Sequence, residues 1–137
     1  MADTIRPVDY YRVEVPDKAG EGVGLLSGLK QAGVNLLACC GFPLKDGRAQ
    51  LDLVPEDPEA FGKAATTLKL KLSDPKKAFF IQGQDHIGAV ADIFAKLAAA
   101  KINIVASQAL AAGAGHWAMI LWVKTADYRR ASQALQG

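Results

Sequence analysis

Two short loops in the sequence carry an aspartate and, three residues later, a glycine, each just before a stretch with helical spacing. They are Asp17 with Gly20, and Asp85 with Gly88. Backbone N–H groups in the first turn of a helix have no partner inside the helix, and together with the helix dipole they attract an anion such as a carboxylate. The glycine lets a ligand approach the backbone closely, and the aspartate accepts from an ammonium group. Because an amino acid carries both groups, the chemistry of these loops suits it.

Both loops belong to an internal repeat with an offset of 68 residues, in which "DKAGEGVGLLSGLKQAGVNL" is followed later by "DHIGAVADIFAKLAAAKINI". Only two copies are present, and the period is longer than that of common solenoid arrays, which predicts a duplicated small domain. The matching pairs are Asp17/Asp85, Gly20/Gly88, Leu29/Leu97, Ala32/Ala100, Asn35/Asn103, Ala38/Ala106, Gly47/Gly115 and Leu53/Leu121.

The same order of elements is predicted in each copy. Aromatic and β-branched residues at 10–15 and 78–83 indicate first strands, and an amphipathic helix follows each loop. A second strand, a turn, a third strand and a second helix come next, with Asp57 and Thr125 as the helix caps. The alternating "LKLKL" that begins at residue 68 indicates a fourth strand in the first copy. The helical face is assigned to Val23, Leu26, Leu29 and Lys30, and to Val90, Ile93, Phe94 and Leu97.

The predicted fold class is therefore α+β, with two ferredoxin-like β-α-β-β-α-β units in tandem, the second lacking its last strand. The expected domains are an N-terminal arm at 1–9, a first unit at 10–75 and a second unit at 76–137. An absent last strand would leave the edge of the 78–83 strand unpaired, and proteins usually cover such an edge. The N-terminal arm, the 69–72 strand or a second chain is expected to cover it.

The outward faces of the two predicted sheets differ. Alternation places polar side chains on the first face, but Phe80, Ile120 and Trp122 on the second. Contiguous apolar patches of this kind mark interfaces, so these three residues are predicted to dock on a partner, in a homodimer.

Composition excludes several classes of protein. The chain has 137 residues, is 50% hydrophobic and 22% charged, and has a net charge of +2, which fits packed small domains and does not indicate a nucleic-acid or membrane partner. The uncharged stretch 102–123 is better explained by two strands than by a membrane span. The adjacent Cys39 and Cys40 are expected to be buried thiols in a reducing compartment, and with no secretory signal the expected location is cytoplasmic.

The sequence shows no nucleophile with its base, no metal-ligand cluster and no phosphate-binding loop with lysine, so no catalysis, no cofactor and no metal is expected. Two other functions stay open. An RNA-binding module of the same topology would stack bases on Phe80, Trp117 and Trp122, although no basic residues frame these aromatics. An interaction module without a small ligand would use the apolar face and the open edge.

The doubled phrase resembles the ACT family of small regulatory domains that bind amino acids. The family pattern of Asp-x-x-Gly, a helix and a Gly-(Ile/Val)-Asn-(Ile/Leu) step is matched at Asp17, Gly20 and "GVNL", and again at Asp85, Gly88 and "KINI". The resemblance covers about residues 10–135. Two features depart from the pattern: Ala19 and Ile87 stand where a proline is common, and the second unit lacks its last strand.

The resemblance implies a non-catalytic sensor that holds an amino acid or related small metabolite between two units. With no catalytic domain expected in the chain, a separate regulated enzyme is the implied partner. Each assigned position also has a structural explanation: the aspartates as caps, the glycines as turn formers, the asparagines as local hydrogen-bond partners and His86 as an exposed loop residue. The ligand-binding residues carried over from the family are Asp17, Ala19, Gly20, Asn35, Asp85, His86, Ile87, Gly88 and Asn103.

Overall fold

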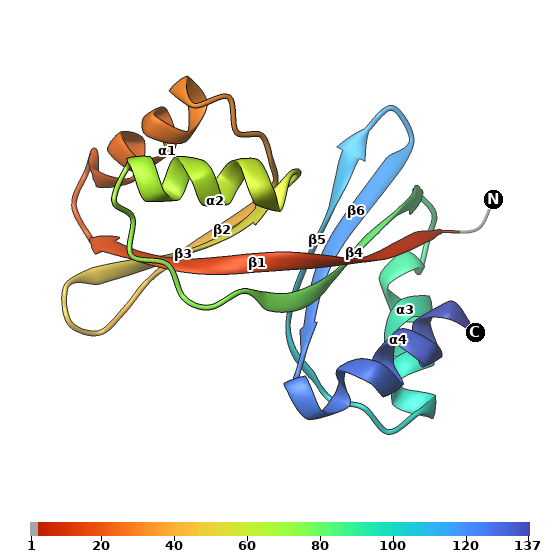
Figure 1. The fold of residues 1–137 in the computed structure, drawn as a ribbon. Helices are drawn as coiled ribbons and strands as arrows, with labels where there is room; N and C mark the ends of the chain where they lie inside the picture. The colour runs from red at the N-terminus through yellow and green to blue at the C-terminus, as the bar shows by residue number, and fades with distance from the viewer. Residues whose placement is uncertain (1–2) are drawn as a thin grey trace. The chain divides into compact units, whose positions relative to one another are not determined.

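The structure is a computed structural model that describes residues 3–137. Strands and helices are interspersed along these residues (Figure 1), and hydrogen-bonded neighbours give the strand order β2-β3-β1-β4-β6-β5. The α+β class is confirmed. The elements are β1 (Thr4–Pro16), α1 (Glu21–Gln31), β2 (Leu36–Pro43), β3 (Arg48–Pro55), α2 (Pro58–Thr67), β4 (Lys76–Gln84), α3 (Ala89–Ala99), β5 (Ile104–Gly113), β6 (His116–Val123), the 3₁₀ helix η1 (Thr125–Asp127) and α4 (Tyr128–Gln136).

The chain divides into two compact units. The first unit is Asp9–Lys76, and the second unit combines Lys77–Gly137 with the described residues 3–8. The long strand β1 therefore contributes its last residues to the first unit and its first residues to the second. The N-terminal arm expected as a separate segment is part of the second unit.

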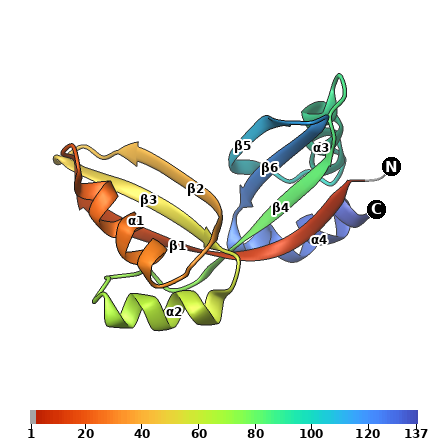
Figure 2. The same cartoon turned by 90° about the horizontal axis from the view of Figure 1, so that it is seen from above.

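In the first unit, α1 and α2 cover one face of β1, β2 and β3 (Figure 2). Antiparallel pairing sets Tyr11 opposite Leu53, and alternation then turns Val13 and Leu53 toward the helices. Asp57 caps α2 as predicted, because its carboxylate accepts from the N–H groups of Glu59 at 3.1 Å and Ala60 at 3.3 Å. The buried core consists of Val13, Leu25, Leu29, Leu53, Phe61 and Ala64.

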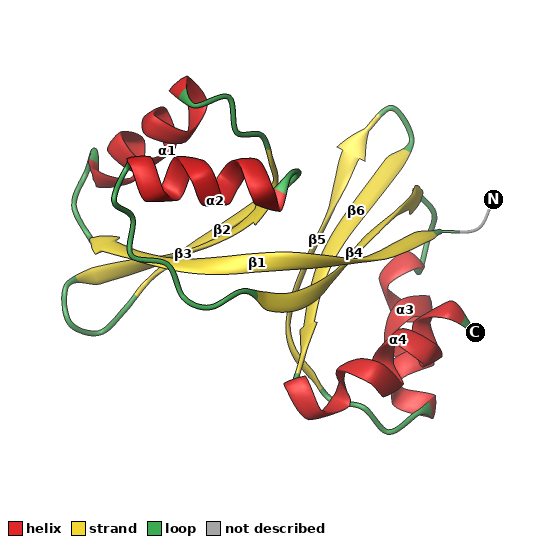
Figure 3. Ribbon diagram, viewed as in Figure 1, coloured by secondary structure: helices red, strands yellow, loops and turns green. Residues whose placement is uncertain are grey.

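The fourth strand predicted for this unit is absent. Residues 70–75, between α2 and β4, run as a loop (Figure 3). One backbone bond joins this loop to β1, from the N–H of Ser73 to the carbonyl of Arg12 at 3.0 Å. The N–H of Arg12 donates to the Ser73 hydroxyl at 2.9 Å instead of to a carbonyl. A side chain thus replaces the second rung of the ladder, and regular strand pairing stops there.

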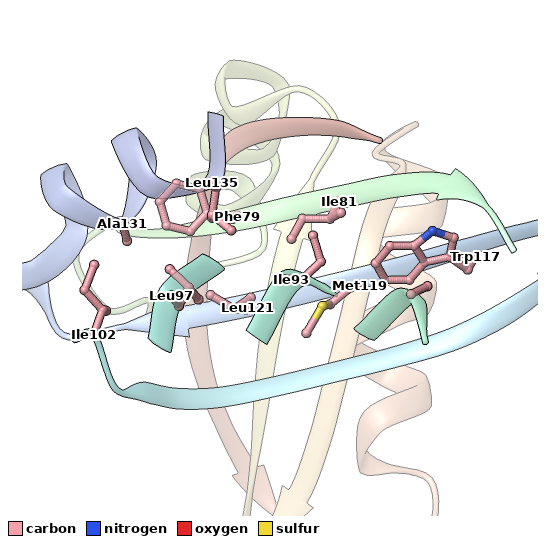
Figure 4. Close-up of a cluster of buried hydrophobic side chains, with 11 residues drawn as sticks. Phe79, Ile81, Ile93, Leu97, Ile102, Trp117, Met119, Leu121, Ala131 and Leu135 are labelled. Carbon is pink, nitrogen blue, oxygen red and sulfur yellow. The ribbon is translucent and has the colours of Figure 1, made fainter. Parts of the chain in front are cut away.

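In the second unit, α3 and α4 pack on β4, β6 and β5. The residues of β1 that belong to this unit lie beside β4, where Ile5 packs against the core and its carbonyl accepts from the Gln136 side chain at 3.3 Å. Of the three candidates for covering the β4 edge, the N-terminal arm is the one observed. Figure 4 shows the core of this unit, formed by Phe79, Ile81, Ala89, Ile93, Leu97, Ile102, Trp117, Met119, Leu121, Ala131 and Leu135.

The predicted core-facing sides of α1 and α3 are partly wrong, and so is the predicted cap of α4. Val23 is 66% exposed and Phe94 is 40% exposed, so neither faces the core. The buried positions are Leu25 and Leu29 in α1 and their repeat partners Ile93 and Leu97 in α3. Thr125 does not cap α4, because a turn of 3₁₀ helix intervenes and Asp127 occupies the cap without a side-chain hydrogen bond.

The outward sheet faces also differ from expectation in one respect. The polar face of the first unit is as predicted, with Glu14 bridging two arginines. Phe80, Ile120 and Trp122, however, are only 7%, 4% and 6% exposed in the single chain. The expectation of an open apolar face is wrong, and the assignment of these three residues to a homodimer interface loses its basis.

Candidate functional site

The first loop–helix junction has an uncapped helix start. Gly20 is the N-cap of α1 in the left-handed conformation, with φ of 92°, and no side chain hydrogen-bonds to the first turn. The N–H of Asp17 donates to the carbonyl of Gly47 at 2.9 Å, which ties the loop to the turn between β2 and β3. The N–H of Gly24 donates to the carbonyl of Gly20 at 3.2 Å, so the helical ladder starts there.

The second junction repeats the cap conformation and both of these backbone bonds. Gly88 caps α3 with φ of 83° and again no side chain participates. The N–H of Asp85 donates to the carbonyl of Gly115 at 2.8 Å, and that of Asp92 to the carbonyl of Gly88 at 3.0 Å. The two copies of the repeated phrase therefore fold alike. The positive φ at both caps explains the glycines, because side chains are strained in that conformation.

Neither aspartate serves as a helix cap. Within residues 3–137, the carboxylates of Asp17 and Asp85 have no hydrogen-bond or ion-pair partner, and both residues are exposed, as is Ala19. The first helical N–H of each junction donates to a loop carbonyl, from Glu21 to Lys18 at 3.2 Å and from Ala89 to His86 at 3.3 Å. Each junction thus presents the next N–H groups of the first turn and, three residues before the cap, a carboxylate without an ion-pair partner among the described residues. Such a site can take an anionic group at the helix and a cationic group at the aspartate.

The other predicted site residues lie apart from this arrangement or act locally. Asn35 follows the far end of α1, and an eleven-residue helix spans about 16 Å, so Asn35 and Gly20 are not brought together within the unit. The Asn35 side chain donates to Glu56 at 3.2 Å. Asn103 and Gly88 are likewise separated by the full length of α3, which also has eleven residues. His86 is exposed, with Nδ1 at 3.2 Å from the carbonyl oxygen of Ile87, and the Ile87 side chain is fully exposed.

Two grooves of the first unit were not anticipated. One, of about 480 Å³, runs along β1 beside the first turns of α1, with apolar residues at its base and Glu14, Glu21, Lys69 and Lys71 among its lining. The other, of about 260 Å³, is lined by Arg12, Glu14, Arg48, Lys71, Leu72 and Ser73. The alternating charges of β1 and of "LKLKL" were the available signal, but that segment was assigned to a strand that would have filled this space.

Burial removes the basis for RNA stacking. Phe80, Trp117 and Trp122 are all less than 10% exposed, and Arg6 lies over the Phe80 ring at 5.3 Å from its centroid. A base cannot stack on rings that are covered in this way.

Cys40 is buried, whereas Cys39 is exposed, which corrects half of the expectation for these thiols. Desolvation by neighbouring protein atoms, which is partial at Cys39, raises the pKa of both thiols, with a smaller contribution from the charge of Asp52, so both thiols stay protonated near neutral pH. Across residues 3–137, no group of three or more histidine, cysteine, aspartate or glutamate side chains is arranged to hold a metal ion. No helix in that range is long and apolar enough to cross a bilayer.

No protein-family model and no curated protein matches the chain. Several solved structures, in contrast, are similar to this chain. A protein from Bacteroides thetaiotaomicron is 17% identical with a TM-score of 0.81, over 96% of this chain and 88% of its own. The ligand-free regulatory subunit of aspartate kinase from Thermus thermophilus is 13% identical with a TM-score of 0.62, over 98% and 94%. The corresponding subunit from Thermus flavus is 16% identical with a TM-score of 0.57, over 99% and 95%.

The chain has the fold of these regulatory subunits. The resemblance to the ACT family that the repeated phrase indicated is therefore confirmed for the fold. At sequence identities of 13–17%, structural similarity establishes a shared fold, whereas the function of a site depends on the residues of this chain.

Proposed function

We propose that the chain is a non-catalytic regulatory protein that binds an amino acid or a related small metabolite at the N-terminal ends of α1 and α3. The observation that carries the proposal is the duplicated junction, in which an uncapped helix start and an unpaired aspartate recur with the same backbone bonds. The ligand carboxylate would accept from the first-turn N–H groups, and its ammonium group would donate to Asp17 or Asp85.

The structural neighbours support a regulatory role, because two of them are regulatory subunits of aspartate kinase. By analogy, we propose that ligand binding here is transmitted to a separate enzyme. Asn35 and Asn103 would then contribute to a ligand site only from a neighbouring unit or copy, since each lies at the far end of its own helix from the junction.

We further propose that two copies associate along β5. This strand ends the sheet order, and its ten residues, Ile104–Gly113, include no charged side chain that would discourage edge pairing. Val105 and Leu110 on β5 are exposed, as are Val90 and Phe94 on α3. A two-fold axis brings the same strand of both copies together, so one uncharged edge can supply both sides of the interface. Sedimentation equilibrium tests this association.

The same exposed surface favours a second function, an interaction module that needs no small ligand. The two functions differ in what they expect of the junctions. A sensor requires Asp17 and Asp85 to contact a ligand, whereas an interaction module leaves them in solvent.

A thermal-shift screen over the twenty amino acids tests the proposal. A ligand that binds only the folded chain raises its unfolding free energy by about 2.7 kcal/mol at one hundred times its dissociation constant, and the melting temperature rises accordingly. The Asp17→Asn/Asp85→Asn double variant should lose most of that rise. An Asp74→Asn variant, which changes an exposed aspartate outside both junctions, is the matched control and should keep it. If none of the twenty shifts the melting temperature, the amino-acid sensor is wrong and the interaction module is favoured.

A further inference from the structure

The smaller groove of the first unit lies on the side of its sheet that faces away from the helices. Arg12 and Glu14 on β1 alternate with the core-facing Val13, and Arg48 is on the neighbouring strand β3. The wall opposite them is the loop that follows α2, at Lys71, Leu72 and Ser73. This loop would have been the fourth strand, so the groove exists because the strand did not form.

The groove carries an excess of positive charge. One carboxylate, that of Glu14, is shared by two guanidinium groups: Nη2 of Arg12 lies 2.9 Å from Oε2, and Nη2 of Arg48 lies 3.1 Å from Oε1. Lys71 adds a third cation at the opposite wall. Among the lining residues, three cations and one anion leave a net charge of +2; Asp52, opposite Arg12 on β3, lies outside this lining, and its carboxylate accepts from the Gln50 side chain at 2.9 Å. Each arginine uses one terminal nitrogen on Glu14, which leaves further N–H donors for another acceptor.

The Nε of Arg12 is a donor that the protein itself leaves without a partner. This atom is buried, and within residues 3–137 it has no hydrogen-bond partner. Buried donors without partners are uncommon in folded proteins because losing the bond to water is unfavourable. The surroundings of Arg12 are also fixed, since its main chain is bonded on both sides to Ser73, through the hydroxyl at 2.9 Å and the N–H at 3.0 Å. The backbone of Arg12 is therefore fixed by Ser73, and its guanidinium is oriented by the ion pair with Glu14.

We propose that this groove binds an oxyanion, namely the phosphoryl or carboxylate group of a small ligand. Two arginines held by one glutamate suit an acceptor with several oxygen atoms, because guanidinium donors match oxyanion geometry better than a single point acceptor. The volume of about 260 Å³ is just below the range of pockets that enclose a whole drug-sized molecule. The groove thus holds the anionic group, and the remainder of the ligand extends outward. This site is separate from the loop–helix junctions and does not depend on them.

Titration of the ¹⁵N-labelled full-length chain with inorganic phosphate, and separately with acetate, tests the proposal at constant ionic strength. Saturable shifts are expected at the amides of residues 12–14, 48 and 71–73. Arg48→Gln should weaken the binding about tenfold or more, the effect of losing one charge-assisted hydrogen bond. Arg48 is more than half exposed, so the variant should fold normally. Arg129→Gln removes the same charge from α4, outside the groove, and should change the affinity less than twofold.

Preference for phosphate or for acetate identifies the anionic group, and either result supports the site if Arg48→Gln weakens that binding about tenfold or more while Arg129→Gln does not. Shifts that do not saturate, or that are equally reduced in Arg48→Gln and Arg129→Gln, would overturn the proposal. The same spectra report the junctions at residues 17–24 and 85–92, where an added amino acid tests the proposed function. Absence of binding at the groove is therefore distinguishable from absence of binding at the junctions, because the two sites shift different amides.

Discussion

The two units differ at the position where a fourth strand is expected, which is filled by part of β1 in the second unit and by a loop in the first. In the second unit, the first residues of β1 lie beside β4, and Ile5 packs on the core. In the first unit, the loop of residues 70–75 meets β1 through one backbone bond and one serine hydroxyl, and two grooves remain along the strand. The difference shows that the two copies of a repeated sequence can keep the same junctions while the edge strand is paired in one unit and borders a groove in the other.

Removing the arm should have the largest effect. Deletion of residues 1–8 exposes the edge of β4 and the core beneath Ile5, so the second unit should lose more than about 3 kcal/mol of unfolding free energy, from several backbone bonds and one apolar side chain. Urea unfolding followed by tryptophan fluorescence measures it, because both tryptophans, Trp117 and Trp122, lie in this unit. Thr4→Ala, at an exposed arm residue, is the control and should be nearly neutral. An unchanged midpoint after deletion would mean that the arm does not complete this unit.

An effect of intermediate size on stability is expected at the C-terminal ends of α1 and α3. Gly33 and Lys101 occupy equivalent positions after the helix, both with left-handed backbone, at φ of 77° and 59°. Only the glycine adopts that conformation without strain, so Lys101→Gly should stabilise the chain by about 1 kcal/mol and Gly33→Lys should destabilise it by about 1 kcal/mol. Lys101→Ala keeps the strain and removes the charge, and it should not reproduce the gain. Thermal unfolding of the three variants decides whether the backbone or the charge is responsible.

The smallest expected effect concerns pH and Cys40. Burial, then the charge of Asp52, then Cys39 raise the pKa of this thiol above its ordinary value of 9.0. The unfolded chain therefore releases the proton first, so the unfolding free energy is constant below the ordinary pKa and falls as pH rises through the folded value. Cys40→Ala should reduce the decline above about pH 9, where Cys39 still contributes, and Asp52→Asn should reduce it through both thiols. Chemical denaturation at several pH values measures this, and an equal slope in Cys40→Ala would contradict the assignment.

The junctions and the α+β class were within reach of sequence reasoning because their signals are local. A glycine required at positive φ, an aspartate three residues earlier and a proline after Asp57 act within one turn of chain. The helix faces of α1 and α3 were harder. Apolar residues such as Val23 and Phe94 suit either a core or a surface, and their exposure depends on where the sheet lies.

The open apolar face, by contrast, was wrongly predicted, since alternation tells which residues share a face but not what covers it. Phe80, Ile120 and Trp122 share a face as expected, and they are buried all the same. The arginine-lined groove, which we propose to bind an anion, was missed for a related reason. Arg12, Arg48 and Lys71 are far apart in sequence, and only folding places them around one groove.

The sequence alone determined the duplicated strand–loop–helix units and their uncapped glycine starts, because backbone preferences and local bonds act between residues a few positions apart. The tertiary structure alone decided that β1 serves both units and that residues 70–75 leave an arginine-lined groove. Those outcomes depend on which distant strand edge a segment meets, and local backbone preferences do not specify that edge.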